Sequence, residues 1–155
     1  MRRFTRDDRQ SILDRVYTHF IENQQPAGRD NGGARCLYHG VDKNGPQVSC
    51  AIGIFDTDHR FDRESLITLG VRQMIDVDPD ALADVFGSAV FSDLDLEFLI
   101  GVQDEHDLAV RRAALSDPNF DTFFIEELAH RLDRFAGEQD LVSPCSPSDF
   151  GPAEL

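Results

Sequence analysis

Apolar residues recur every three or four positions through most of this chain, with polar residues between them. This is the period of an α-helix with one buried face, and it predicts helices over 5–24, 63–75, 79–91, 93–115 and 118–136. Thr5 and Asp8 suit a capping box at the start of the first helix. Asp78 before Pro79 suits a second helix start, and Gly137 suits a helix end.

Residues 35–55 break the helical pattern with two short β-prone runs, over 35–41 and 47–54. Asn44 and Gly45 stand between the runs, and this dipeptide favours a two-residue hairpin turn. In that register the cross-strand pairs are Leu37 with Ile52, His39 with Cys50, and Val41 with Val48. A lone ribbon is marginal in water, so it must pack on the helices. The predicted class is α+β, mostly α, with about five helices around one small antiparallel β-hairpin.

The length of 155 residues favours one domain, which can fold without a disulfide or a metal. We expect a globular domain over 1–141, and a flexible tail over 142–155 because this segment is rich in Pro and Ser. The sequence contains no run of 18 apolar residues, so it predicts no transmembrane helix. The charged start of the chain does not resemble a secretory signal, and three cysteines without such a signal favour reduced thiols in the cytoplasm.

The charge changes this picture of an ordinary helical domain. Asp and Glu number 29 against 15 Lys and Arg, which gives a net charge of −14. Such a surface repels phosphate backbones, so direct nucleic-acid binding is not expected. The 15 basic residues include a single lysine, Lys43, and GC-rich coding would account for this bias toward arginine. The acidity itself fits adaptation to high salt, or a surface that docks on a basic protein.

Four residues of metal-ligating type, Cys36, His39, Cys50 and His106, invite comparison with a zinc site. Cys36 and His39 have the spacing of half a zinc knuckle, but Cys50 has no Cys or His partner within four residues. In the Asn-Gly register Cys36 and Cys50 point to opposite faces of the hairpin, whereas a longer turn would bring them together. We therefore expect both cysteines to be buried small hydrophobic groups, and we expect no metal and no cofactor.

His106 and Asp107 form a His-Asp pair on a predicted helix. Such a pair occurs in metal-dependent phosphohydrolases, in which His59 and Asp133 would supply the further ligands, but the flanking residues do not fit that class. We favour a histidine at the edge of the core. It would hydrogen-bond a hairpin carbonyl or Tyr38 and so lock the hairpin to the helix.

The order of these motifs resembles a group of small uncharacterised proteins of phage and bacterial genomes. The matching residues are Cys36 and Tyr38, then Cys50, Ala51 and Gly53, then His106 and Asp107. The resemblance covers most of residues 12–141, and the middle of this chain is longer than the pattern. It implies an N-terminal helix, a hairpin and a later His-Asp helix, and it implies no activity.

No nucleophile elbow, phosphate-binding loop or dinucleotide signature is present in the sequence, which favours a protein that is not an enzyme. The sequence therefore predicts an acidic interaction protein, related to phage proteins, that binds a basic protein or inhibits one by imitating nucleic acid. Two alternatives stay open. One is a small metal-dependent enzyme or metal-binding protein built on the hairpin and His106–Asp107, and the other is a halophile-adapted domain whose acidity has no partner role.

Overall fold

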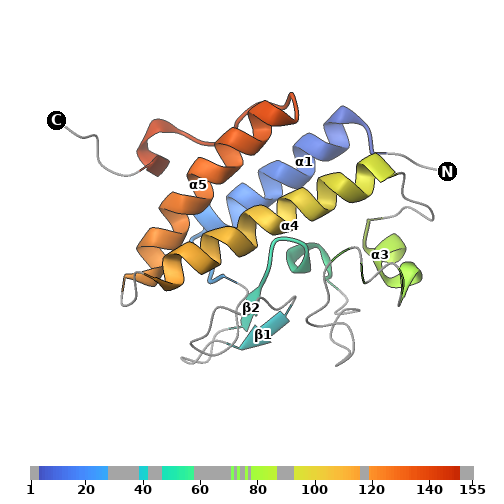
Figure 1. Cartoon of the computed structure of the whole chain (residues 1–155), viewed down its shortest axis with the longest axis horizontal. Helices are drawn as coiled ribbons and strands as arrows, with labels where there is room; N and C mark the ends of the chain where they lie inside the picture. The colour runs from blue at the N-terminus through green and yellow to red at the C-terminus, as the bar shows by residue number, and fades with distance from the viewer. Residues whose placement is uncertain are drawn as a thin grey trace.

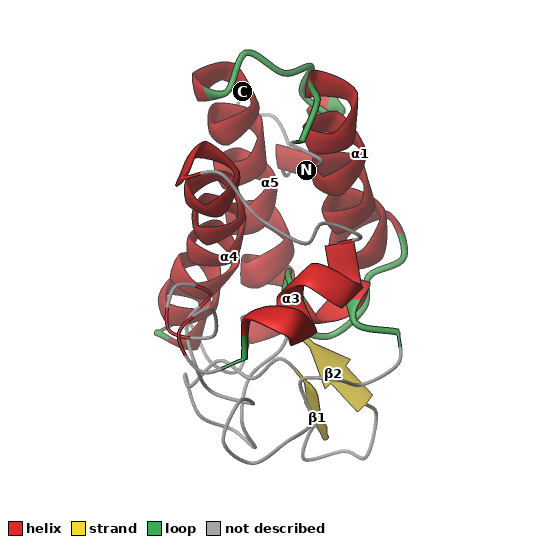
Figure 2. Ribbon diagram, turned by 90° about the vertical axis from the view of Figure 1, so that its right-hand side faces the viewer, coloured by secondary structure: helices red, strands yellow, loops and turns green. Residues whose placement is uncertain are grey.

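The computed structural model describes residues 4–27, 39–41, 47–57, 71, 73, 76, 78–86, 93–115 and 119–150. Its described α-helices are α1 (Arg6–Tyr17), α3 (Pro79–Phe86), α4 (Asp93–Ala114) and α5 (Phe120–Glu138). The long helices α1, α4 and α5 lie side by side, and α3 lies near one end of them (Figures 1 and 2). None of the described helices combines the length and the apolar content that a membrane crossing requires.

Helix α1 begins at the capping box predicted from its sequence, since Thr5 and Asp8 each accept a hydrogen bond from the other's backbone N–H. It then continues into a π-helical turn over Thr18–Glu22. The wider turn keeps two consecutive residues, Phe20 and Ile21, in the buried face. The helical segment thus covers 6–22, within the range of 5–24 expected from the apolar spacing.

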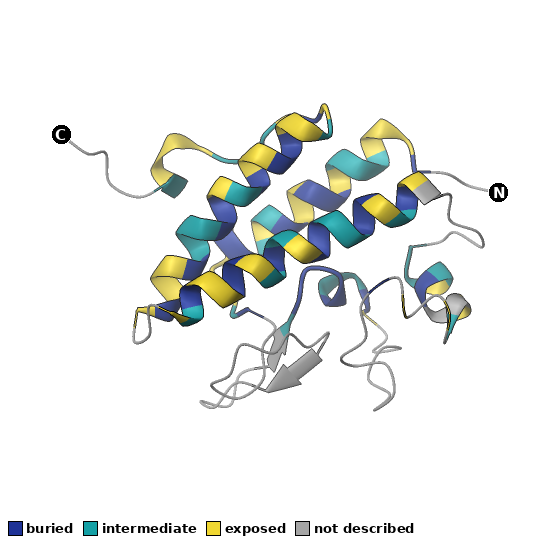
Figure 3. Ribbon diagram, viewed as in Figure 1, coloured by how far each residue is buried: buried dark blue, intermediate teal, exposed yellow. Residues whose placement is uncertain are grey.

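Helices α4 and α5 form the most extensive contact between described elements, and their buried faces turn toward each other and toward α1 (Figure 3). Phe98 on α4 lies against Phe135 on α5, with ring centroids 5.6 Å apart. Phe135 also lies directly over Gly101, where α4 carries no side chain. The described helices share one hydrophobic core that includes Leu13, Leu99 and Leu132, each fully buried.

The α+β prediction is wrong, because helices account for the body of the described structure and the strand content is too small to form a layer. Strands β1 (His39–Val41) and β2 (Gln47–Ser49) are three residues each. The hairpin predicted over 35–55 is not shown: residues 35–38 and 42–46, with the Asn44-Gly45 turn, lie outside the described residues. The second predicted strand also stops at Ser49, and the chain then turns into a 3-10 helix over Gly53–Phe55.

The pairing of the two short strands also differs from the predicted register. His39 pairs with Ser49 and Gly40 with Val48, whereas the Asn-Gly turn predicted His39 opposite Cys50. A shift of one residue exchanges the two faces of a strand, so the apolar face inferred from the sequence does not hold. The chain leaves the strand after Ser49, and the small residues Ala51 and Gly53 are both buried in the segment that follows.

The ends of other helices differ from their predicted ranges. Helix α3 covers 79–86 of the predicted 79–91, and most of the helix predicted over 63–75 lies outside the described residues. Helix α5 continues through Gly137 to Glu138, so Gly137 is not its end. The left-handed residue that follows α5 is instead Asp140, with φ 54°.

Residues 142–150, which we call the strap, were expected to be a loose tail, but they lie along α1 and α5. The backbone of Val142 bonds Gln10 on α1, and Cys145 Sγ lies 3.3 Å from the carbonyl oxygen of Ala129 on α5. A 3-10 helix over Pro147–Phe150 ends the strap. Its polar composition therefore serves hydrogen bonds to the helices.

Candidate protein-interaction site

His106 lies in the middle of the described core, not at its edge. Its side chain is fully buried between the rings of Phe20 and Phe124, with centroids 5.1 Å and 5.6 Å away. Its Nδ1 lies 3.0 Å from Oδ1 of Asp107, the next residue along α4. The His-Asp pair singled out in the sequence is thus in contact. Tyr38, one of the partners expected for His106, lies outside the described residues.

Gln103 carries the link between α4 and the segment after β2, and the sequence analysis missed it. Its Oε1 accepts the N–H of Ile52 at 3.0 Å, and its Nε2 donates to Asp107 Oδ1 at 2.8 Å. Both Gln103 and Ile52 are buried, so the bond satisfies a backbone donor that has no access to water. The signal in the sequence was a polar residue directly after Val102, inside the apolar stripe of α4.

The two cysteines that the structure describes, Cys50 and Cys145, are free thiols that pack against neighbouring residues. Cys50 is buried, and this burial raises the pKa of its thiol to about 12. Burial raises the pKa of the half-buried Cys145 to about 11. Both are free thiols and are protonated at neutral pH, which makes them weak nucleophiles.

The remaining residues named from the sequence give no metal centre in the part of the chain that is described. Gly53 opens the 3-10 helix, His39 belongs to β1, and Cys36 lies outside the described residues. Among the described side chains, no three of His, Cys, Asp or Glu gather in a way that could hold a metal ion.

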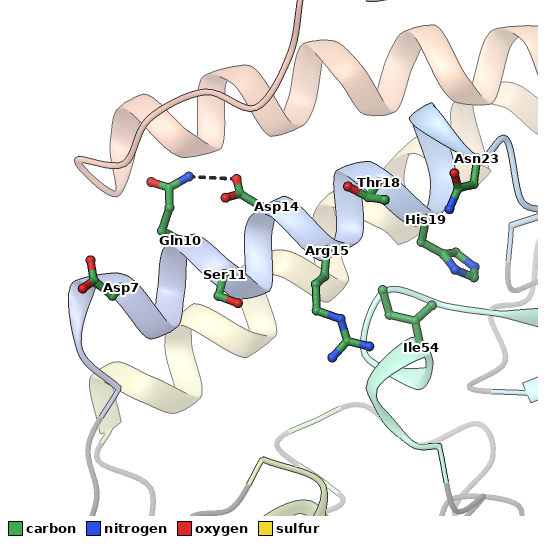
Figure 4. Close-up of a pocket in the computed structure, with 9 residues that line it drawn as sticks. All are labelled: Asp7, Gln10, Ser11, Asp14, Arg15, Thr18, His19, Asn23 and Ile54. Atoms are coloured by element: carbon green, nitrogen blue, oxygen red, sulfur yellow. Dashed lines mark hydrogen bonds between the residues drawn. The ribbon is translucent and has the colours of Figure 1, made fainter.

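The exposed face of α1 and of the π-helical turn after it carries a row of polar side chains. We call it the α1 ridge and define it as Asp7, Gln10, Asp14, Thr18 and Glu22. Residues three or four apart share one side of a helix, so these side chains form a single row. Figure 4 shows the first four along one edge of α1, whereas Arg15 and His19 point toward Ile54. The row carries three carboxylates and no cation.

Two hollows lie on either side of the α1 ridge, and Gln10, Asp14 and Thr18 line both. One has a volume of about 510 Å³ and is closed on its far side by Ile54 (Figure 4). The other has a volume of about 470 Å³ and lies between α1 and Val142–Pro144 of the strap. The ridge is therefore accessible from both sides.

Three of the four arginines of α4 and α5 are held in ion pairs with carboxylates of the same two helices, and the exposed Arg111 is not among them. The nitrogen–oxygen distances are 3.0 Å for Arg131–Glu127, 3.3 Å for Arg112–Glu127, 3.5 Å for Arg131–Glu105, and 3.6 Å for both Arg134–Glu105 and Arg134–Glu138. Arg6 donates to the carbonyl of Asp140, and Arg15 lies over the ring of Phe55 at 4.7 Å. These positive charges are directed at groups of the chain itself.

The carboxylates of the α1 ridge lack such partners. Within the described residues, Asp7 and Glu22 make no ion pair, and Asp14 accepts a hydrogen bond from the neutral amide of Gln10 at 2.9 Å. His19, beside the ridge, adds no positive charge at neutral pH, because burial, His106 and Arg15 lower its pKa. Where exposure is described, twelve exposed carboxylates stand against five exposed arginines. The ridge is thus an unneutralised part of an acidic surface.

No family model, no curated protein and no solved structure matches this chain.

Proposed function

We propose that this protein is an acidic interaction protein that binds a basic protein through the α1 ridge. The observation that supports the proposal is the difference between two faces of the same molecule. Arginines pair with Glu105 and Glu127 on α4 and α5, but Asp7, Asp14 and Glu22 face solvent without a cation among the described residues. Unpaired carboxylates in a row attract cationic side chains and speed their encounter with the surface.

The spacing of the ridge defines the partner surface that it fits. Asp7 and Asp14 are seven residues apart, which is about 10.5 Å along a helix that rises 1.5 Å per residue. A partner helix with arginines seven residues apart, lying beside α1, would place one cation at each carboxylate. Ile54 and Val142 border the two hollows, and these apolar groups suit the aliphatic stems of arginine or lysine.

The cytoplasm is the compartment that we propose for this interaction, since the described cysteines are free thiols. The relation to phage proteins and the imitation of nucleic acid stay predictions from the sequence. The salt-adaptation alternative makes a different prediction, namely a melting temperature that rises steeply up to molar KCl.

The proposal is tested by titrating the chain into a fluorescently labelled helical peptide with arginines seven residues apart. The ridge variant carries Asp7→Asn and Asp14→Asn, the two carboxylates that the peptide arginines address, and the matched control carries Glu97→Gln and Asp133→Asn on α4 and α5. Both lose two exposed charges. Exposed charge pairs contribute about 0.2–1 kcal/mol each, so the ridge variant should bind about 2- to 30-fold more weakly.

The control variant should retain nearly all of the affinity, and binding of the wild-type chain should weaken as salt is added. An equal loss in the two variants would assign the binding to net charge and would contradict a site at the ridge. An absence of binding by the wild-type chain at low salt would contradict the proposal as a whole. Unchanged melting temperatures of both variants establish that the fold is retained.

A further inference from the structure

The strap is held on α1 in the way that a bound peptide is held. The side-chain amide of Gln10 accepts the N–H of Val142 at 2.9 Å and donates to its carbonyl at 2.9 Å. Both bonds go to the main chain of Val142, whose side chain is 65% exposed. Gln10 therefore binds a main-chain peptide group, and any peptide that places such a group beside Gln10 could form these bonds without a covalent link to α5.

The far end of the strap makes a second set of contacts with the helices, through the side chains of Asp149 and Phe150. Asp149 Oδ2 accepts the hydroxyl of Tyr17 at 2.7 Å and the backbone N–H of Ser146 at 2.7 Å. The ring of Phe150 lies over His130 of α5, with centroids 4.8 Å apart. The strap therefore spans α1 and α5 with an anchor at each end.

The strap leaves part of this groove open. A hollow of about 470 Å³ lies beside Val142–Pro144, and another of about 330 Å³ lies beside Ser148 and Asp149, between the end of α1 and the start of α5. The hollows lie beside the two ends of the strap. A peptide segment can therefore approach Gln10 and Tyr17 while the strap detaches from these two residues.

The turn that joins α5 to the strap contains one residue, Asp140, in a conformation that glycine favours. Asp140 has φ 54°, a left-handed conformation that non-glycine residues rarely adopt. Opening this turn into an extended link would relieve that conformation. The strap contacts would be recovered in full on a second copy of the chain, which is the condition for exchange of a segment between copies.

We propose that the groove between α1 and α5 is a binding site for a strap in trans, and that its occupant is the strap of a second copy of this chain. Exchange is opposed by the net charge of −14 on each copy. Salt screens this repulsion, so the exchanged dimer should form at high ionic strength and high protein concentration. This groove shares Gln10 and the hollow beside Val142–Pro144 with the α1 ridge, but its occupant and its test differ from those of the proposed basic partner.

The test compares two substitutions at the same residue, Asp140→Pro and Asp140→Gly, by light scattering after size-exclusion chromatography in about 0.5 M KCl, where exposed charges are strongly screened. Proline excludes the left-handed turn and removes the N–H that bonds Gly137 at 3.3 Å, so Asp140→Pro should be a dimer. Glycine accepts the turn, so Asp140→Gly should remain at the 17.4 kDa mass of one chain.

An excess of a synthetic peptide of residues 141–150 should convert the Asp140→Pro dimer to monomer, because the peptide occupies the same groove. A dimer that the peptide leaves unchanged would overturn the proposal, and so would a folded Asp140→Pro chain that stays monomeric. If Asp140→Pro does not fold, the labelled peptide is titrated into the full chain carrying Phe150→Ala, which loosens the internal strap. Saturable binding that Tyr17→Phe weakens supports the site, and absence of binding overturns it.

Discussion

Two glycines inside long helices make the packing of α4 on α5 measurable with a single type of substitution. Gly101 lies in α4 and Gly137 lies near the end of α5. Alanine is favoured over glycine in a helix interior by about 1 kcal/mol. A Cβ at 101 would meet Phe135 Cε2 at 2.8 Å and Cζ at 3.2 Å, whereas a Cβ at 137 would meet nothing within 4 Å. The same substitution should therefore have opposite effects at the two positions.

The expected magnitudes follow from these contacts. Gly137→Ala should raise the free energy of unfolding by about 0.5–1 kcal/mol, with the lower value favoured because the position is close to the helix end. At 101 the same gain is opposed by overpacking, which costs about 1–3 kcal/mol in a tight core. Phe135 cannot move aside easily, since it is 4% exposed and its ring lies against Phe98. The upper part of that range, about 2–3 kcal/mol, therefore applies, and after the gain of about 1 kcal/mol Gly101→Ala should lower the free energy of unfolding by about 1–2 kcal/mol.

Urea denaturation followed by circular dichroism measures both changes, and each kcal/mol should shift the melting temperature by about 2–4 °C for a chain of this size. The double variant Gly101→Ala with Phe135→Leu tests the cause, because a smaller side chain at 135 removes the clash. The cost of Gly101→Ala should shrink in that background. A Gly101→Ala chain as stable as the wild type would refute the close approach of α4 and α5 on which the reasoning depends.

Four further outcomes follow from described contacts. Asp140→Gly should raise the free energy of unfolding by about 0.5–1 kcal/mol in urea denaturation, because glycine adopts φ 54° without strain. Gln103→Leu should lower it by about 1–3 kcal/mol and speed hydrogen exchange at the amide of Ile52, since a buried donor loses its acceptor. The hydrogen bond to Asp149, then burial, raise the pKa of Tyr17 to about 12, so ultraviolet titration should find one tyrosine ionising there, and Asp149→Asn should return it toward 10. Burial alone would raise the pKa of Asp149, but the hydrogen bonds that it accepts from Ser146 and Tyr17 outweigh burial and lower this pKa. These hydrogen bonds should persist at neutral pH and be lost in acid, below the pKa of Asp149 in the folded protein. The NMR resonances of Tyr17 in an acid titration would report their loss.

The helices were the predictable part of this fold, because helical periodicity and capping depend on residues that are close together in the sequence. Thr5 and Asp8 form the expected capping box. The strand register was not predictable, because it depends on the length of a turn, and a shift of one residue paired His39 with Ser49. Gly137 was taken for a helix end because glycine favours that position, yet the left-handed residue is Asp140.

The polar contacts were less predictable than the helices, because they join residues far apart in the sequence. Gln103 bonds Ile52, which is 51 residues away in the sequence, and Tyr17 bonds Asp149, which is 132 residues away. The unpaired carboxylates of α1 also could not be recognised in advance. A list of charges does not show that Arg112 pairs with Glu127 on the neighbouring helix and leaves Asp14 without a cation.

The π-helical turn at Thr18–Glu22 has a consequence for how the length of this chain can vary. A π turn holds one residue more than an α turn, with the N–H of Asn23 bonding the carbonyl of Thr18 at 2.8 Å. Removing one residue there would let the backbone close as an ordinary α turn and leave the earlier part of the helix undisturbed. The same deletion in the middle of α4 would rotate every following side chain by about 100°. Shorter versions of this chain should therefore lose their residue at the end of α1.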